Sequence, residues 1–504
     1  MARHKTSEVI SIPRPDPAGP GSLYLQLARS IEDEIRTGRL PVGRRLPAER
    51  ELASHLGVSR TTVTGAYQEL EARGLLRGHV GRGTVVVAAP ADAAKTALPW
   101  SQRASAVATQ AAQMWFGIPR DRSDVVAFDT GWPDPQLYPV EALESLSRGL
   151  LGQSAIEIYG AAPPSGDPVL RETLSRWLAS RGIRTASDGV LITTGAQQGL
   201  NVLARAFLSP GDVVVTEDPT FQCALVAFRW AGADVVGVPI DHDGIQPDAL
   251  EAALVRHRPK LVYLIPTFHN PTGSVMTRDR RRLVLDLAAR YRVPIVESDV
   301  YSEIFFEDAP PPRLKALDGA GLVIYQGSFS KIAVPGLRVG WLVAPPGAMV
   351  PLIAAKGYQD LHTAVMMQRL AAAFMDSPHL ERHLALLRAE CRVRRDRLVA
   401  SLRQHCPQLR FRIPPGGYYL WAQLPPPLTT DQLLPSANEA GVAVRPGPQF
   451  TPGHGGESHI RLCFAALEPR GLAEGARRLG EALEQAWRRV ETPARREPAA
   501  VSAV

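Results

Sequence analysis

Lysine is scarce in this chain of 504 residues. Of its 57 basic residues only six are lysines, and arginine supplies the rest. The six are Lys5, Lys95, Lys260, Lys315, Lys331 and Lys356. Lys331 stands in "GSFSKIAVPGLRVGW", residues 327–341, among small serine and glycine residues. Because arginine cannot act as a nucleophile at neutral pH, a lysine kept in this place indicates that its primary amine is required.

Cysteine and long hydrophobic runs are also rare. No run of about 18 apolar residues occurs, so we expect no membrane-spanning helix. The first 21 residues lack the apolar core of a secretory signal, which favours a cytoplasmic protein. The cysteines lie far apart and match no zinc-ligand spacing, so we expect reduced thiols and no metal site. The four are Cys223, Cys391, Cys406 and Cys463.

Positive charge is concentrated near the N-terminus. Residues 1–90 hold 13 Lys and Arg against 9 Asp and Glu, a balance of +4 out of +7 for the whole chain. Such a segment favours a polyanionic partner such as nucleic acid.

The composition changes along the chain indicate five segments. A tail rich in proline and glycine, which we expect to be disordered, covers residues 1–21. A first domain follows at 22–88, and a linker rich in alanine, serine and threonine at 89–124. The larger domain covers 125–488, and a flexible tail covers 489–504.

Residues 22–88 carry three helical patterns and one hairpin pattern. Apolar residues recur every four positions in "LYLQLARSIEDEIRTG", and "LPAERELASHLG" ends at a glycine. Ser59 is a natural N-cap for a third helix, and "LLRGHVGRGTVVV" predicts two strands around a glycine-rich tip. This order predicts a winged helix-turn-helix, whose recognition helix enters the major groove of DNA.

The residue types at the start of the third helix suit DNA. Arginine binds phosphates or guanine edges, and short hydroxyl side chains allow close approach to phosphates. The residues that fit are Ser59, Arg60, Thr61 and Thr64, with Arg50 upstream and Arg82 beside the wing. Residues 22–88 resemble the DNA-binding domain of the GntR family of bacterial regulators. That resemblance implies operator contacts from Arg50, Ser59, Arg60, Thr61, Thr64 and Gly81.

From about residue 125, strand-like and helix-like runs alternate, which predicts a mostly parallel α/β sheet. The expected strands are 190–193, 213–216, 235–238, 261–265, 294–297, 322–325 and 338–343. After residue 380 a long arginine-rich helix precedes "GGYYLWAQL" and "HIRLCFA", which predicts a smaller α+β lobe.

An amine such as that of Lys331 can hold an aldehyde as a Schiff base, and pyridoxal phosphate is the commonest such aldehyde. In "TTGAQQGL", backbone N–H groups of Gly195, Ala196 and Gln197 would meet a phosphate at a helix N-terminus. Three further groups lie near the lysine in sequence and suit a phosphate: Ser328, Ser330 and Arg338. Phe221 in "EDPTF" suits a ring face, and Asn270 in "TFHNPTG" suits a phenolate oxygen.

Residues 125–485 resemble the class I/II aminotransferases, which are fold-type I pyridoxal-phosphate enzymes. The resemblance implies that Lys331 is the aldimine lysine and that Arg461, in "HIRLCFA", grips a substrate carboxylate. It also implies cofactor contacts from Phe221, Asn270, Tyr301, Ser328 and Arg338, and from Tyr159 given by a neighbouring subunit.

One position departs from this pattern. The acid that meets the pyridine nitrogen in these enzymes lies three residues before the tyrosine, but here that residue is Ser298. Either the adjacent Asp299 takes the role through a local shift, which we favour, or the nitrogen lacks a carboxylate. Without the carboxylate the ring is a poorer electron sink, and transamination becomes slow.

The combination of a GntR-type head and an aminotransferase-like domain resembles the MocR subfamily of transcriptional regulators. This resemblance implies a homodimer. We predict a DNA-binding regulator whose larger domain senses an amino compound, or pyridoxal 5'-phosphate itself, through an aldimine at Lys331. The alternative is a working aminotransferase acting on an amino acid, so enzyme activity stays an open question at this point.

Overall fold

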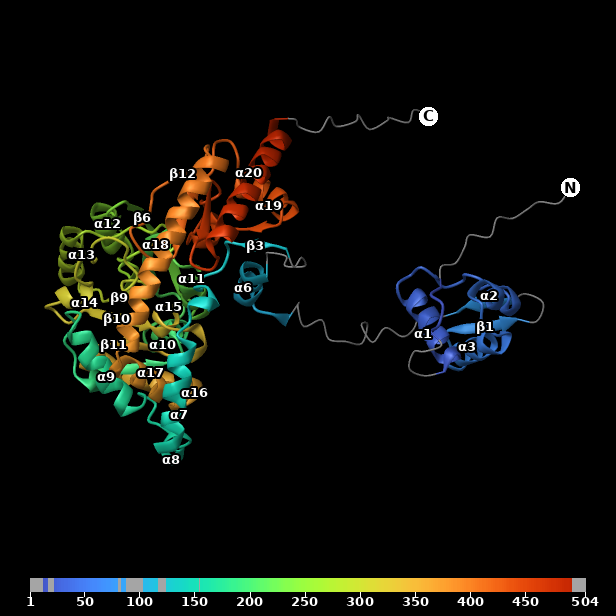
Figure 1. Cartoon of the computed structure of the whole chain (residues 1–504), viewed down its shortest axis with the longest axis horizontal. Coiled ribbons are helices and arrows are strands. Elements are labelled where there is room, and N and C mark those ends of the chain that lie inside the picture. The colour runs from blue at the N-terminus through green and yellow to red at the C-terminus, as the bar shows by residue number, and fades with distance from the viewer. Residues whose placement is uncertain are drawn as a thin grey trace. The chain divides into compact units, whose positions relative to one another are not determined.

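The computed structural model describes residues 12–16, 22–79, 83–87, 103–116, 124–153 and 155–491. The chain divides into two compact units, Met1–Ser105 and Ala106–Val504 (Figure 1). The division falls inside the segment that the sequence predicts as a linker, and a helix, α6, begins at Ala106. The predicted fold class, a winged helix-turn-helix joined to an α/β aminotransferase-like domain, is confirmed.

The first unit is a three-helix head with a β-hairpin. Its elements are α1 (Leu23–Arg36), α2 (Glu49–Leu56), α3 (Arg60–Ala72), β1 (Leu76–His79) and β2 (Gly83–Val86). Leu27, Ile31, Val63 and Leu70 are fully buried between the helices, as the four-residue spacing predicts. β1 and β2 pair antiparallel, and together they form the wing.

The turn between α2 and α3 has the geometry of a helix-turn-helix. Gly57 ends α2 with a φ of 63°, a left-handed conformation that glycine adopts without steric cost. Ser59 caps α3, and its hydroxyl accepts a hydrogen bond from the Thr62 backbone N–H at 3.1 Å.

Residues 12–16 correct part of the predicted tail. Ile12 is buried in the core of the head, and the Arg14 guanidinium donates to the Gly57 carbonyl at 3.4 Å. The Asp16 backbone N–H donates to the Gln26 side chain at 2.9 Å. The prediction of a tail over 1–21 missed this contact because a single isoleucine carries no periodic signal. The tail predicted after residue 488 begins inside a helix that ends at Glu491.

The second unit is built on an eight-stranded sheet of order β4-β11-β10-β9-β8-β5-β6-β7. In that order the strands are Val190–Thr193, Gly340–Val343, Val323–Ser328, Ile295–Ser298, Leu261–Leu264, Val213–Asp218, Asp234–Asp241 and Gly244–Ile245. All seven strands expected from the sequence are present. β11 runs antiparallel to both of its neighbours, and β7 forms a short antiparallel hairpin with β6, so the sheet is mixed.

Helices cover both faces of this sheet. One face packs against α10 (Ala196–Phe207), α11 (Gln222–Trp230) and α16 (Pro346–Asp360). The other face packs against α9 (Pro168–Ala179), α12 (Pro247–His257), α13 (Arg278–Tyr291) and α17 (Val365–Asp376). Shorter or peripheral helices are α6 (Ala106–Phe116), α7 (Val140–Gln153), α8 (Ala155–Ile158), α14 (Leu314–Leu317) and α15 (Phe329–Ile332).

The predicted smaller lobe is a four-stranded sheet of order β12-β13-β16-β15, backed by three helices. The strands are Arg410–Phe411, Tyr419–Gln423, His459–Cys463 and Arg445–Pro446. The helices are α18 (His379–His405), α19 (Thr430–Glu439) and α20 (Pro469–Glu491), and α18 lies beside α20 (Figure 1). β14 (Val442–Ala443) pairs parallel with β3 (Val126–Ala127), which fastens the start of the unit to this lobe.

Among the described helices, none is both long enough and apolar enough to cross a membrane.

Candidate functional site

The turn from β4 into α10, which we call the anion cup, has a geometry that suits an anion. Gly195 caps α10 with a φ of 82°, so the first backbone N–H groups of the helix, including those of Ala196 and Gln197, lie at the strand end. The Arg338 guanidinium donates to the Thr194 carbonyl at 3.3 Å, and a Cβ on Gly195 would lie 2.7 Å from its Nη2 atom. A helix N-terminus and a guanidinium therefore face the same small space, which suits a phosphate group.

Ser328 and Ser330 lie at the end of the neighbouring strand. Ser328 is the last residue of β10, stands opposite Gly340 in β11 and caps α15. Its hydroxyl accepts a hydrogen bond from the Ser330 backbone N–H at 3.2 Å. Gly340 itself lies against the cup, because a Cβ there would be 2.8 Å from the Gly195 carbonyl carbon. The two serines are buried, and Lys331 follows them directly.

The Lys331 amine contacts a backbone carbonyl and an aromatic ring. Its Nζ donates to the Gly131 carbonyl at 2.6 Å and lies 3.6 Å from the centre of the Trp132 ring. Burial lowers the pKa of this amine to about 7. At neutral pH a large share of the amine is therefore uncharged, which is the state that attacks an aldehyde. No sequence pattern indicates a role for Gly131 or Trp132.

Arg461 and Asn270 meet near this amine. Arg461 is 3 % exposed, and its Nη1 donates to the Asn270 side-chain oxygen at 3.0 Å. Its Nη2 donates to the carbonyls of Asp129 and Thr130, and the guanidinium lies 4.0 Å from the Tyr419 ring centre. These contacts fix the orientation of the guanidinium, and within the described residues its Nε–H has no partner, so it is left to bind an anion.

The remaining predicted cofactor contacts are the aromatic residues Tyr301, Phe221 and Tyr159. The hydroxyls of Tyr301 and Tyr419 lie 2.9 Å apart, and burial raises the pKa of Tyr301 well above its ordinary value, so it stays a neutral hydroxyl. Phe221 precedes α11 and is half-buried against the apolar cluster of that face. Tyr159, in contrast, lies just after α8 and is 77 % exposed.

Asp299 is bound by three donors. Its Oδ2 accepts from Arg313 Nε at 2.6 Å, from the Ser302 hydroxyl at 2.8 Å and from the Tyr325 hydroxyl at 3.1 Å. Ser298, the last residue of β9, is also buried. No sequence pattern indicates that Arg313 pairs with Asp299.

Buried polar atoms around the site lack partners within the described part of the chain. They include Arg461 Nε, Thr220 Oγ1 and Gln222 Oε1, the last two flanking Phe221. Because such atoms are costly unless a ligand or water satisfies them, and because the Arg338 guanidinium lies against Gly195 at the start of α10, the residues fit a phosphorylated cofactor.

The predicted DNA contacts lie on one part of the head. Arg50, Ser59, Arg60 and Thr61 are exposed, and Arg60 pairs weakly with Glu49, since their side-chain atoms are 3.3 Å apart and both reach solvent. Thr64 is half-buried and donates to Glu49 at 2.9 Å. Gly81 and Arg82 lie outside the described residues.

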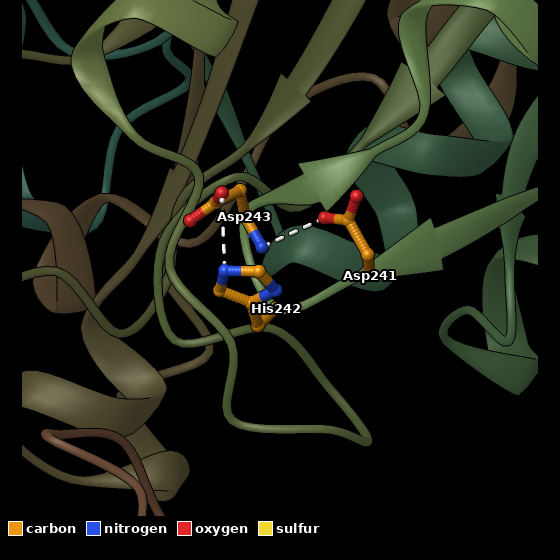
Figure 2. A group of neighbouring side chains, drawn as sticks. All are labelled: Asp241, His242 and Asp243. Carbon is orange, nitrogen blue, oxygen red and sulfur yellow. Dashed lines mark hydrogen bonds and ion pairs between the residues drawn. The ribbon is translucent and has the colours of Figure 1, made fainter.

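One group of side chains offers ligand atoms of the kind that metals bind. Figure 2 shows three consecutive residues: Asp241, which ends β6, and His242 and Asp243, which follow it. Hydrogen bonds within the turn and an Arg280 guanidinium 3.2 Å from Asp241 account for their arrangement.

The head and the amine site together define a DNA-binding transcriptional regulator with an aminotransferase-like body. Residues 23–86 match the model of "Bacterial regulatory proteins, gntR family", and residues 135–479 match "Aminotransferase class I and II". The chain is 33 % identical to the HTH-type transcriptional regulator TauR of Rhodobacter capsulatus, over 93 % of this chain and 98 % of that protein. It is 31 % identical to the probable rhizopine catabolism regulatory protein MocR of Rhizobium meliloti, over 91 % and 93 %.

A solved structure supports the fold of the second unit. The α-aminoadipate aminotransferase LysN of Thermus thermophilus aligns with a TM-score of 0.72 at 34 % identity, over 78 % of this chain and 100 % of that one. The chain therefore belongs to the class I and II aminotransferase family through its larger unit and to the GntR family through its head. This is the architecture of the MocR subfamily, as the sequence predicted.

Proposed function

We propose that this protein binds operator DNA through its head and holds pyridoxal 5'-phosphate on Lys331, where an amino compound that bears a carboxylate controls DNA binding. The observation that carries the proposal is the partly neutral Lys331 amine beside an anion cup and a buried arginine. When bound, the cofactor supplies an aldehyde that reacts with primary amines.

Different residues bind the phosphate, the ring and the amino compound. Arg338, Ser328 and the start of α10 hold the phosphate, and Asn270 and Tyr301 orient the ring through its phenolate oxygen. Arg461 takes the carboxylate of the amino compound. Control of DNA binding requires that this compound bind two arrangements of the protein with different affinity.

The same fold implies a dimer. Relatives of this fold form paired subunits, and the exposed Tyr159 side chain supports the proposal that it reaches the phosphate of a partner subunit. Sedimentation of the full chain with and without cofactor measures this directly.

The test of the whole proposal uses the purified full chain. We expect a visible absorbance band that changes when the effector amine is added, together with a change in operator affinity measured on the same sample. A colourless protein that ignores added pyridoxal phosphate contradicts the proposal.

The second candidate function is transamination, which the low pKa of the Lys331 amine and the fixed Arg461 favour. Ser298 weighs against it, since a hydroxyl stabilises a protonated pyridine nitrogen less than a carboxylate does. Rapid turnover of an amino acid and a keto acid would establish the enzyme.

The pH dependence of cofactor capture follows from the Lys331 pKa of about 7. Because the neutral amine is the reactive form, we expect the initial rate of capture by cofactor-free protein to rise about tenfold per pH unit below pH 7 and to level off above it. Stopped-flow absorbance measures the rate. A free lysine derivative, with an ordinary pKa near 10.4, should keep rising through pH 9. A protein profile that does the same would show that the amine is not activated.

On the head, Arg60→Ala is expected to weaken operator binding by about 5- to 150-fold, because a base or phosphate contact of this kind contributes roughly 1–3 kcal/mol. Because the ion pair between Arg60 and Glu49 is exposed, we expect its loss to leave the stability of the head nearly unchanged. The measurement is a mobility shift at fixed salt, with the cofactor band as control. The matched control is Arg36→Ala, which removes an exposed arginine from the C-terminal end of α1. Equal affinities for all three proteins would remove Arg60 from the DNA-binding face.

A further inference from the structure

Ser298 and Asp299 point to opposite faces of the central sheet. Successive residues of a strand alternate between its two faces, and paired residues of neighbouring strands share a face. Ser298, the last residue of β9, stands opposite Gln326 of β10. The Gln326 side-chain amide donates to the Ala196 carbonyl at 2.7 Å, in the first turn of α10. Ser298 therefore lies on the face of the anion cup, one strand away from a side chain that contacts this turn.

Asp299 is held on the other face. Its backbone N–H donates to the Gln326 carbonyl at 2.8 Å and so continues the pairing of β9 with β10 by one residue. Its Oδ2 bonds to the hydroxyl of Tyr325, which precedes Gln326 and points away from α10, and to Arg313 at 2.6 Å. Its Oδ1 has no partner among the described residues, but it belongs to the same carboxylate. A shift that carried Asp299 to the anion cup would break this buried ion pair with Arg313, which is strongly destabilising.

No other carboxylate of the described strands β5 to β9 takes the place of Asp299 on the cup face near Ser298. Glu297 points to the same face as Asp299 and accepts from two backbone N–H groups at the start of α14. Glu217 of β5 also points away from the anion cup and lies 3.3 Å from the His269 ring. Asp218 shares the cup face, but it lies two strands from β9, on the side of β6.

Hydroxyl groups lie on the cup face instead. Tyr263 of β8 is fully buried in the apolar cluster between the sheet and α10. Burial raises the pKa of Tyr263, and the neighbouring Ser298 hydroxyl partly opposes this rise. Within the described part of the chain, the Tyr263 hydroxyl makes no hydrogen bond of good geometry. Because a neutral phenol donates a proton and a buried donor without a partner is costly, these two hydroxyls suit a ligand atom that accepts a hydrogen bond.

The ring nitrogen of pyridoxal phosphate is such an acceptor when it is unprotonated. A carboxylate beside this nitrogen stabilises its protonated form, whereas a hydroxyl carries no charge to do so. The charged groups near this face are cations, since the charges of Arg461 and Lys331 both act on the Cys223 thiol of α11. Burial and positive neighbours both disfavour a positively charged nitrogen.

We propose that Ser298, supported by Tyr263, meets the ring nitrogen of the cofactor and keeps it unprotonated. A protonated nitrogen makes the ring an electron sink, which eases loss of the hydrogen next to the amine of a bound amino compound. With an unprotonated nitrogen the site binds the amino compound reversibly and leaves it intact, as a sensor requires. The inference rests on the proposed function, and it favours sensing over transamination.

The test uses the full chain loaded with a cofactor that is isotope-labelled at the ring nitrogen, because the nitrogen NMR shift reports whether that atom is protonated. We expect the unprotonated signal in the native chain at neutral pH. Ser298→Asp should convert it to the protonated signal. Ser298→Asn, which has the same size as aspartate without its charge, is the matched control and should not. Asp299→Asn should leave the nitrogen unprotonated, as in the native chain.

A second measurement addresses the supporting hydroxyl. We expect Tyr263→Phe to weaken cofactor binding by about 2- to 12-fold, the range that one neutral hydrogen bond supplies. Tyr291→Phe is the control, because the Tyr291 hydroxyl bonds to Glu251 on the other face of the sheet. Titration of the visible band measures both affinities. Equal affinities of the two variants would remove Tyr263 from the ring nitrogen.

The NMR outcomes separate this inference from the proposed function. A native nitrogen that is protonated, and that loses its proton in Asp299→Asn, would assign the role to Asp299 and overturn the inference while cofactor binding stands. A chain that binds no cofactor would overturn both. The native chain and the two Ser298 variants decide the outcome even where Asp299→Asn, which weakens a buried ion pair, is too unstable to measure.

Discussion

Replacing Lys331 with alanine is expected to remove the visible cofactor band completely while operator binding persists. The Lys331 amine is held between the Gly131 carbonyl and the Trp132 ring, and no other described lysine has such a setting. Lys315 donates to the Val323 carbonyl and faces Asp318, and Lys356 is paired with Asp360, so both amines are occupied by structural contacts. Without Lys331 the site loses its nucleophile but keeps its anion cup.

The matched control is Lys260→Ala, which removes an exposed lysine and should leave the band intact. Absorbance spectra of the three proteins after equal exposure to pyridoxal phosphate and gel filtration decide the outcome. A full band in Lys331→Ala would show that another amine captures the aldehyde, and the assignment of this lysine would fall. Loss of DNA binding in the same variant would show that the two units are not separable.

Gly340→Ala is expected to have the second largest effect, a loss of about 1–3 kcal/mol of stability together with cofactor affinity at least tenfold lower. A Cβ at this position would lie 2.8 Å from the Gly195 carbonyl carbon and 2.9 Å from the Ala196 nitrogen. Both are backbone atoms of the cup, so they cannot rotate away as a side chain would. The first turn of α10 has to move, and the N–H groups that bind phosphate move with it.

Gly347→Ala is the control for this substitution, because nothing lies within 4 Å of a Cβ at that helical position. Thermal unfolding with and without the cofactor, and titration of the visible band, measure the two effects. If Gly340→Ala binds the cofactor as tightly as Gly347→Ala, the phosphate does not occupy the space between β11 and α10.

Much of the fold could be predicted because its central strands are short apolar runs with helices between them. Val190–Thr193 has the same bounds in the sequence prediction and in the structure. The helix-turn-helix of the head could also be predicted from the sequence. Its turn depends on Gly57, which ends α2, and on Ser59, which caps α3, and both residues follow local rules. Lys331 is predicted by two local features, the scarcity of lysine in the chain and the small serine and glycine residues around it.

The remaining contacts depend on tertiary structure. Gly131 meets Lys331 from 200 residues earlier in the chain, and no local pattern marks either Gly131 or Trp132. The pairing of Arg445 with Arg461 depends on the register of a strand only two residues long. The ion pair of Asp299 with Arg313 is likewise invisible in the sequence, although Ser298 was recognised there as a departure from the family pattern.

The hydrogen bond from Lys331 to Gly131 links the amine to a part of the backbone far away in the sequence. Gly131 lies shortly after β3, inside the larger unit, which begins at Ala106. Any molecule that binds the Lys331 amine competes with its hydrogen bond to the Gly131 carbonyl and so removes one contact that holds this segment. Chemistry at a single nitrogen is thereby coupled to the backbone that follows β3 in the larger unit.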